Sequence, residues 1–320
     1  MIPLQVNDSY AKIHFDKIRT KLLHHIERIL NNGGIKKQPK NAANYTIRYS
    51  PELENDLNNF LNDPDTFLYP LITQTPDQLI DLIMEWHNTV SSYIDETSPD
   101  YKILGNIFVS SVYENDFDKW EFINRINVDT CSYCNRNYIF TTPKNKRIKP
   151  EIDHFYPKKK YPMLGLSYYN LIPSCECCNG FGAKGQKDPF SENMVNPYLL
   201  NIDDFIFSHQ VNNIAIINPL VGKSDITVFF KKKIQSHCDI FNLDDIYSLH
   251  HDHAIELVIK QRLKYSKNYN NYLNSYTGLN FSKSEIDRMI LGNYALQKDQ
   301  HKRPLSKLYQ DLGKELGLIK

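Results

Sequence analysis

The first part of the chain has apolar side chains at helical spacing. Between residues 8 and 30 they recur every three or four positions, at Ile13, Ile18, Leu22, Leu23, Ile26, Ile29 and Leu30. This spacing predicts an amphipathic helix, which the run Asn31-Asn32-Gly33-Gly34 would end. Residues 31–50 lack a periodic pattern, and we expect a loop there.

Two more helical patterns follow, near 51–62 and 76–95. The second begins at Thr75-Pro76, which supplies a capping residue followed by proline at the first helical position. The pattern of residues 102–128 predicts a mixture of helix and loop.

The pattern changes again in the second half of the chain. DFIFSHQVNNIAIINP, which begins at Asp204, and SDITVFFKKK, which begins at Ser224, contain alternating and β-branched residues. Together they predict a hairpin or small sheet. Two long helical patterns follow, at about 243–275 and 283–317.

The segment from Cys131 to about Tyr198 differs from both flanks, because it is rich in Cys, Gly, Pro, Asn and Lys. We therefore predict an α+β chain in three parts. Residues 1–128 form an N-terminal helical region, and residues 129–200 form a cysteine-bearing module. Residues 201–320 form the hairpin and a C-terminal helical region.

Composition narrows the class of protein. The 320 residues are 41% hydrophobic and carry a net charge of +1, so any nucleic-acid contact requires a local basic patch. No run approaches the roughly 18 apolar residues of a membrane helix, and MIPLQVNDSYAKIHF does not resemble a secretory signal. We expect a cytoplasmic protein without a membrane partner, whose thiols stay reduced.

Five of the six cysteines lie between Cys131 and Cys178. Cys131-Ser-Tyr-Cys134 and Cys175-Glu-Cys-Cys178 each contain a CxxC pair, and two such pairs typically form a tetrahedral structural zinc site. The alternatives are four unrelated buried thiols or a redox pair. Cys177 competes with its neighbours as a ligand, although the two-residue spacing favours Cys175 and Cys178. Cys238 stands alone and is expected in the core.

Between the two pairs lies an acid next to a histidine, Asp153-His154. A carboxylate binds hard divalent cations, and an imidazole can take a proton from water near neutral pH. Such a pair is common on surfaces and in cores, but its position between two zinc knuckles favours a functional site. His250, His251 and His253 form a weaker cluster, for which a solvated helix face is the simpler interpretation.

With these residues in register, the segment from 131 to about 187 resembles the HNH endonuclease family, whose site is a ββα-metal (His-Me) finger. In that family a CxxC precedes a strand that ends in Asp-His. An asparagine lies five residues before the second CxxC, as Asn170 does here, and a His or Asn follows its last cysteine, as Asn179 does. The resemblance implies a zinc-stabilised ββα finger inside the mostly helical chain.

The resemblance also implies roles for individual residues. His154 would be the general base, Asp153 and Asn179 would bind one catalytic Mg²⁺ or Mn²⁺, and Asn170 would hold the loop that bears the base. The structural Zn²⁺ would be bound by the four ligands Cys131, Cys134, Cys175 and Cys178. The structural alternatives are that Asn170 fixes a turn and that Asn179 is a helix cap.

A basic run surrounds the Asp153-His154 pair. Residues 141–160 contain seven Lys or Arg against two acidic residues, a balance that suits the phosphate backbone of nucleic acid. The predicted nucleic-acid contacts are Lys158, Lys159, Lys160 and Lys184. Family members often carry a lysine a few residues after the last metal ligand; here Gly180-Phe-Gly-Ala precede Lys184 and Lys187 follows, and the pattern leaves open which of the two would contact phosphate.

The run DHFYPKKKYPMLGLSYYNLIPSCECCN, which begins at Asp153, resembles HNH proteins of bacterial anti-phage systems such as Septu. In those systems a separate ATPase subunit controls the nuclease. The resemblance implies a DNA endonuclease that acts as the effector of such a system. Two alternatives stay open: a nuclease that cuts RNA or tRNA, and a non-catalytic zinc-stabilised subunit that binds nucleic acid or assembles with a partner.

Overall fold

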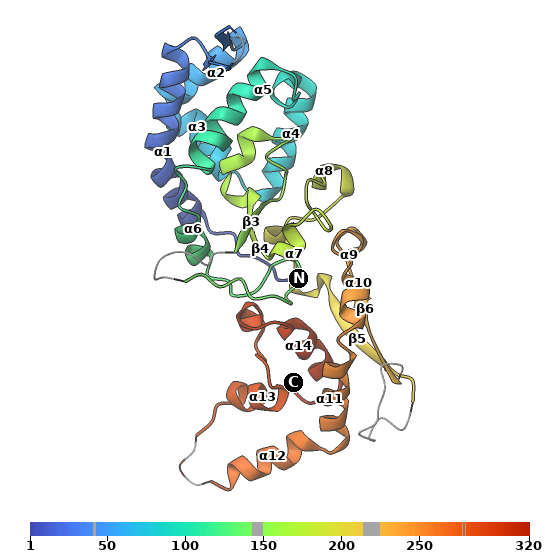
Figure 1. Cartoon of the computed structure of the whole chain (residues 1–320). Helices are drawn as coiled ribbons and strands as arrows, with labels where there is room; N and C mark the ends of the chain where they lie inside the picture. Colours follow the sequence, from blue (N-terminus) through green and yellow to red (C-terminus); the bar gives the residue numbers. More distant parts are fainter. Residues whose placement is uncertain (41–42, 143–149, 214–224, 277, 279) are drawn as a thin grey trace.

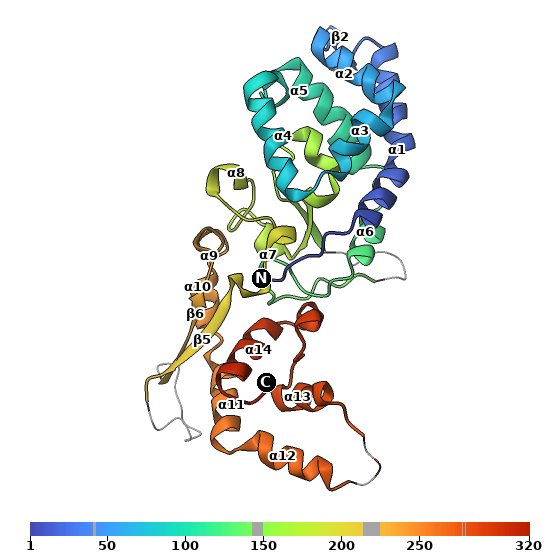
Figure 2. The same cartoon turned by 180° about the vertical axis from the view of Figure 1, so that it is seen from behind.

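The computed structural model describes residues 1–320 except 41–42, 143–149, 214–224, 277 and 279. The chain forms an elongated molecule with helices at both ends (Figure 1). The N-terminal helices occupy one end and the C-terminal helices the other, and the cysteine-bearing segment lies between them. Figure 2 shows the same three parts of the molecule from behind. The chain combines helices with three two-stranded antiparallel sheets among the described residues, as expected for an α+β chain.

The predicted first helix is confirmed as α1 (Asp8–Asn31), which begins where the Asn7 side chain accepts a hydrogen bond from the backbone of Tyr10. Its apolar stripe, including Phe15 and Leu22, packs against α2 (Pro51–Asn62) and α3 (Pro64–Thr73). Burial of this stripe is what stabilises so long a helix, because propensity alone is weak.

The sequence-based description of the next segments needs two corrections. Residues 31–50 are not all loop, because β1 (Ile35–Lys37) pairs antiparallel with β2 (Tyr45–Ile47). The helix expected at 76–95 ends early, as α4 (Pro76–Thr89), and a 3₁₀ turn, η1 (Ser91–Tyr93), follows. The start of α4 is as predicted, with Thr75 in a capping box.

The mixed stretch contains three helical segments. α5 (Pro99–Leu104) continues into η2 (Gly105–Tyr113), a π-helical segment, and α6 (Lys119–Ile126) follows. η2 runs through the core with Ile107, Phe108 and Val112 buried. π-Helical segments are rare and occur frequently at functional sites.

The cysteine-bearing segment contains two strands followed by a short helix. β3 (Glu151–His154) pairs antiparallel with β4 (Leu171–Ser174), and α7 (Glu176–Asn179) packs against β3. The long connection between the strands carries two 3₁₀ turns, η3 (Pro162–Leu166) and η4 (Tyr168–Asn170). After α7 come three further short helical segments: α8 (Pro189–Glu192), η5 (Pro197–Leu199) and η6 (Ile202–Asp204).

The predicted hairpin is confirmed as β5 (Ile206–Val211) paired with β6 (Ile226–Lys232). The prediction of two long C-terminal helices is wrong. The chain instead forms shorter helical segments: α9 (Gln235–Phe241), α10 (Leu243–Ser248), α11 (His251–Arg262), α12 (Tyr265–Asn274), α13 (Lys283–Leu291), η9 (Gln297–Lys302) and α14 (Ser306–Glu315). Asn242, Lys264 and Gly292 adopt left-handed backbone conformations that interrupt the helical path.

A hydrophobic core runs through the described residues from Met1 in the N-terminal segment to Ile319 after α14. Met1 lies in the middle of the molecule beside α7 (Figure 1), where the backbone of Ile2 donates to Ser132. Within the part of the chain that the structure describes, no helix combines the length and apolar character that crossing a bilayer requires.

The buried histidines predict a loss of stability in acid. Burial lowers the pKa of His14 to about 4, and its Nε2 donates to the Leu166 carbonyl at 2.8 Å. Because the unfolded chain binds this proton near pH 6.5, the stabilisation is present above that pH and is lost as the pH falls towards 4. We expect wild type to lose about 2 kcal/mol more than His14→Gln between pH 7 and pH 5, measured by urea denaturation. Equal losses for the two proteins would contradict it.

Candidate functional site

Four of the six cysteines meet in one buried cluster. The sulfur atoms of Cys131, Cys134, Cys175 and Cys178 all lie within 4.8 Å of one another, and the Cys134 and Cys175 sulfurs are 3.9 Å apart. Tetrahedral zinc–thiolate bonds of about 2.3 Å would separate the sulfurs by about 3.8 Å. The cluster could therefore hold a metal such as zinc. Cys177 is exposed and Cys238 is buried in α9, so both lie outside it.

The backbone around the first cysteine pair turns tightly. Asn135 adopts a left-handed conformation with φ 50°, and its N–H donates to the Cys131 carbonyl at 2.8 Å. This turn directs further donors at sulfur: the Arg136 N–H lies 3.4 Å from the Cys134 sulfur and the Asn137 side chain 3.3 Å from the Cys175 sulfur. N–H donors of this kind stabilise thiolates, the form that binds metal.

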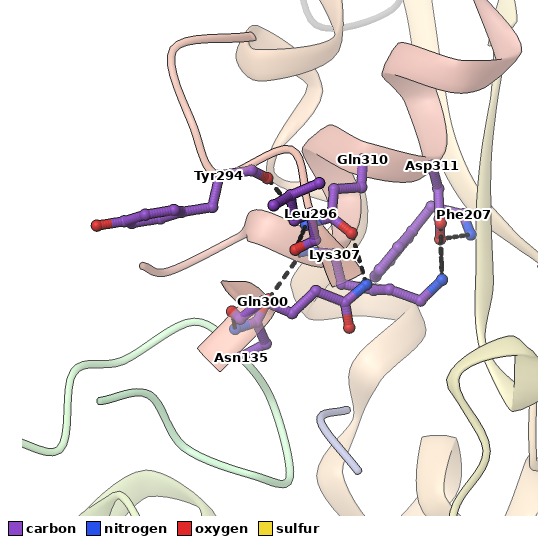
Figure 3. Close-up of polar contacts among 8 residues, drawn as sticks. All are labelled: Asn135, Phe207, Tyr294, Leu296, Gln300, Lys307, Gln310 and Asp311. Carbon is purple, nitrogen blue, oxygen red and sulfur yellow. Dashed lines mark hydrogen bonds and ion pairs between the residues drawn. The ribbon is translucent and has the colours of Figure 1, made fainter. Parts of the chain in front are cut away.

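The same turn connects the cluster to the C-terminal helices. The buried Asn135 side chain donates to the Gln300 carbonyl and accepts from the Lys307 N–H at the start of α14 (Figure 3). Gln300 continues the network to Gln310, and Lys307 pairs with Asp311 at 2.6 Å. These polar groups are buried, and their hydrogen bonds offset the cost of removing them from water. The cysteine cluster is thus joined to the C-terminal helices.

The acid–histidine pair lies at the end of β3, beside this cluster. His154 is 7% exposed, and its Nε2 lies 3.0 Å from the Gly165 carbonyl oxygen. A carbonyl only accepts, so Nε2 carries the proton and the neutral ring keeps its lone pair on Nδ1. The Tyr113 ring packs edge-on against the imidazole at 4.5 Å. Burial, helped by Lys158, lowers the pKa of His154 to about 3, so the ring is neutral at pH 7.

Asp153 points into a fully enclosed polar cluster. Its Oδ1 accepts from the Lys184 ammonium at 3.1 Å, and its Oδ2 accepts from the Tyr133 hydroxyl at 2.5 Å. Lys184 also donates to the His154 carbonyl at 2.8 Å, and its side chain is 0% exposed. Each carboxylate oxygen keeps one lone pair for a further partner. A carboxylate of this kind fits a divalent cation in donor chemistry, although the nearby ammonium would repel it.

The two predicted asparagines occupy different environments. Asn170 is fully buried, accepts from the Tyr156 N–H at 2.7 Å, and donates to the Tyr156 and Leu164 carbonyls. It therefore ties together the two ends of the segment that follows His154. Asn179 ends α7 and is half-buried, and its side chain makes no hydrogen bond to any residue that the structure describes.

The predicted nucleic-acid contacts differ in accessibility. Lys158, Lys159 and Lys160 reach the surface, where each lies near a carboxylate of Glu114, Glu96 or Asp188 respectively. Lys184 does not, because its buried ammonium contacts protein groups, so the expectation of a surface phosphate contact does not suit its position. The basic residues Lys144, Lys146, Arg147 and Lys149 lie outside the described residues.

Sequence reasoning missed the residues that hold the pair in place. Tyr133 lies inside the first CxxC and so connects the cysteine cluster directly to Asp153. Gly165 allows η3 to approach η2 closely, because a Cβ there would lie 3.0 Å from Val109. The sequence shows that Tyr133 lies inside the first CxxC, but no sequence pattern indicates the contact between η2 and η3.

The histidine cluster of α11 does not suit a metal. His250, Asp252 and His253 are close enough to share an ion. However, the Arg136 guanidinium donates to Nε2 of His250 at 2.9 Å, and burial lowers the His250 pKa to about 4. The neutral ring therefore carries its proton on Nδ1, which leaves no lone pair for a metal ligand bond.

The buried pair of Lys184 and Asp153 leads to a stability prediction. Lys184→Met leaves a buried carboxylate without its cation, a change that costs about 3–5 kcal/mol. We expect the free energy of unfolding, measured by urea denaturation without added Mg²⁺, to fall by that amount. Lys159→Met is the control, because its exposed ammonium lies 3.9 Å from Glu96 and should change stability by less than about 1 kcal/mol. Equal effects of the two substitutions would contradict the structural importance of the buried pair.

Comparison with known proteins gives a short but close similarity. Part of the chain is 47% identical over 47 residues to Septu protein PtuB of Bacillus thuringiensis. The match covers 15% of this chain and 18% of the length of that protein. It supports a relationship to Septu-like defence proteins over a limited segment. No protein-family model matches the chain, and no solved structure matches it.

Proposed function

We propose that this chain is a metal-dependent endonuclease of the HNH class that hydrolyses phosphodiester bonds of DNA. The observation that carries the proposal is the state of His154: a neutral imidazole with Nε2 fixed on the Gly165 carbonyl and Nδ1 left as a base. It stands next to Asp153 on a strand–strand–helix unit, with a four-cysteine cluster beside it. A fixed base beside a carboxylate, on a unit that a metal could stabilise, suits hydrolysis of a phosphodiester.

The charges around His154 favour an anionic substrate. The ammonium groups of Lys119, Lys158 and Lys184 lie near enough to lower its pKa. Lys119 and Lys158 both lie over the Tyr113 ring, at 4.3 and 4.6 Å from its centroid. Cations placed around a base suit a phosphodiester, whose charge increases as water attacks.

In the proposed reaction His154 Nδ1 accepts the proton of the attacking water, and the Gly165 carbonyl holds the ring in the required tautomer. Asn170 keeps the following segment in place. Asp153 and Asn179 would hold Mg²⁺ or Mn²⁺, which would supply Lewis-acid stabilisation of the phosphate and the leaving oxygen. The four cysteines would hold Zn²⁺. Tyr133, which lies inside the first CxxC, would hold Asp153 in position through its hydrogen bond.

The short similarity to Septu protein PtuB supports a role in anti-phage defence. We propose that the nuclease is the effector of such a system and works with a separate ATPase subunit. The helical regions on both sides of the cysteine-bearing segment offer surface for such a partner.

A plasmid-nicking assay with purified protein tests the proposed activity. We expect supercoiled DNA to be nicked with Mg²⁺ and to stay intact without it, and a matched RNA to be cut more slowly. Cleavage of RNA alone would replace DNA with RNA as the substrate. No cleavage of either, by protein that contains zinc and is mixed with its ATPase partner, would favour a non-catalytic assembly subunit.

A further inference from the structure

A second feature is a pocket beside η2. It has a volume of about 540 Å³ and lies between the β1–β2 hairpin, α5, η2 and the lysines that follow β3. We call it the basic pocket. Its size falls within the range of about 300–1,000 Å³ that is typical of small-ligand sites, the size class of a nucleotide.

The lining of the basic pocket combines positive charge with apolar surface. Four lysines line it, Lys37, Lys102, Lys158 and Lys159, and none of its lining residues is acidic. Glu114 and Glu96 lie near two of these lysines, and the Lys102 ammonium, which donates to the Thr97 carbonyl at 2.9 Å, interacts with the Asp95 carboxylate, so the positive charge of the four lysines is only partly compensated. Like charges held together in this way favour an anion between them.

Two tyrosines and three apolar side chains also line the pocket. Tyr45 of β2 is 55% exposed, and Tyr101 of α5 donates from its hydroxyl to the Lys159 carbonyl. Ile35, Ile47 and Val109 add apolar surface to the lining. An aromatic and apolar surface with a cationic rim suits a nucleotide, because the base can stack while its phosphate meets the lysines.

The basic pocket shares two elements with the proposed catalytic centre. η2 carries Val109 on the pocket wall and Tyr113 against the His154 ring. Lys158 lines the pocket, and its ammonium lies 4.6 Å from the Tyr113 ring centroid. Tyr113 and Lys158 therefore connect the pocket to the His154 ring.

We propose that the basic pocket binds a nucleotide of the substrate strand next to the phosphate that faces His154. The base stacks on Tyr45, and the adjoining phosphates contact Lys37 and Lys102. This assignment rests on the proposed nuclease function, and it adds a strand-binding subsite formed by the hairpin and α5, which the HNH-like segment does not include.

Binding measured without cleavage tests the pocket separately from the nuclease activity. The probe is a fluorescein-labelled 12-nucleotide single strand of DNA, titrated by fluorescence anisotropy with the full-length protein and no added Mg²⁺. We expect the double variant Lys37→Ala/Lys102→Ala to bind about tenfold more weakly at low salt. Two lost phosphate contacts should also make the slope of log affinity against log salt shallower by about 1.4.

The aromatic position needs its own variants. Tyr45→Ala should weaken binding about tenfold, and Tyr45→Phe should restore it, because stacking requires the ring and not the hydroxyl. Lys314→Ala is the matched control, since this exposed lysine belongs to α14 in the C-terminal part of the molecule (Figure 1). All variants should keep the wild-type melting temperature.

The outcomes separate this inference from the proposed function. If the pocket variants bind like wild type while wild type nicks plasmid, the pocket inference is wrong and the nuclease stands. If they lose binding although wild type does not cut, the pocket is a nucleic-acid site and the proposed activity fails. A wild-type protein that binds no strand at all overturns the pocket inference in either case.

Discussion

Cys134→Ser should remove zinc from the protein and unfold the middle of the molecule. Four buried sulfurs lie within 4.8 Å of one another, and a structural zinc contributes about 10–16 kcal/mol to the folding of small zinc domains. Because Asn135 next to Cys134 is bonded to Gln300 and Lys307, loss of the knuckle should also release α14. We expect less than about one tenth of the wild-type zinc content and a second, lower melting transition.

Cys177→Ser is the matched control for this prediction. Cys177 lies between two proposed ligands in the sequence, but its side chain is exposed and outside the cluster. It should keep one zinc per chain, measured by elemental analysis, and the wild-type melting curve. A Cys134→Ser protein with full zinc content and an unchanged melting curve would show that the four thiols are ordinary core residues.

The elements best predicted from the sequence are those whose burial pattern is local. α1 and the β5–β6 pair follow directly from periodicity, because one face of each is buried against the core. The C-terminal helices were predicted too long. Lys264 separates α11 from α12 with a left-handed φ of 52°, but lysine is not a residue type that indicates a left-handed turn. The β1–β2 hairpin was missed because it is short and mostly exposed.

The candidate site likewise has features that the sequence predicted and features that it did not. Spacing predicted which residue types come together around the two cysteine pairs, and the structure gathers four of those sulfurs and excludes Cys177. Spacing could not predict the partners of Asp153, because the Lys184 ammonium comes from a loop thirty-one residues away. Lysine is almost never fully buried unless it is paired, so the residue type alone favoured a surface contact.

His154→Ala should abolish the proposed cleavage while leaving zinc content unchanged. A positioned general base contributes about 10²–10⁴-fold to a rate. Because Nε2 of His154 donates to the Gly165 carbonyl, the lone pair that can accept a proton is on Nδ1. The measurement is single-turnover nicking of plasmid with saturating Mg²⁺. Since the His154 pKa is lowered to about 3, its protonation should not slow the wild-type reaction between pH 7 and pH 5.

His14→Gln separates loss of the base from loss of packing. His14 is also buried, also has a lowered pKa, and donates to the carbonyl of Leu166, the residue after the His154 acceptor. It should reduce stability in the same region and leave the nicking rate of the folded protein within about threefold of wild type. If His154→Ala still cuts within tenfold of wild type, His154 is not the base, and another group must take the proton from water.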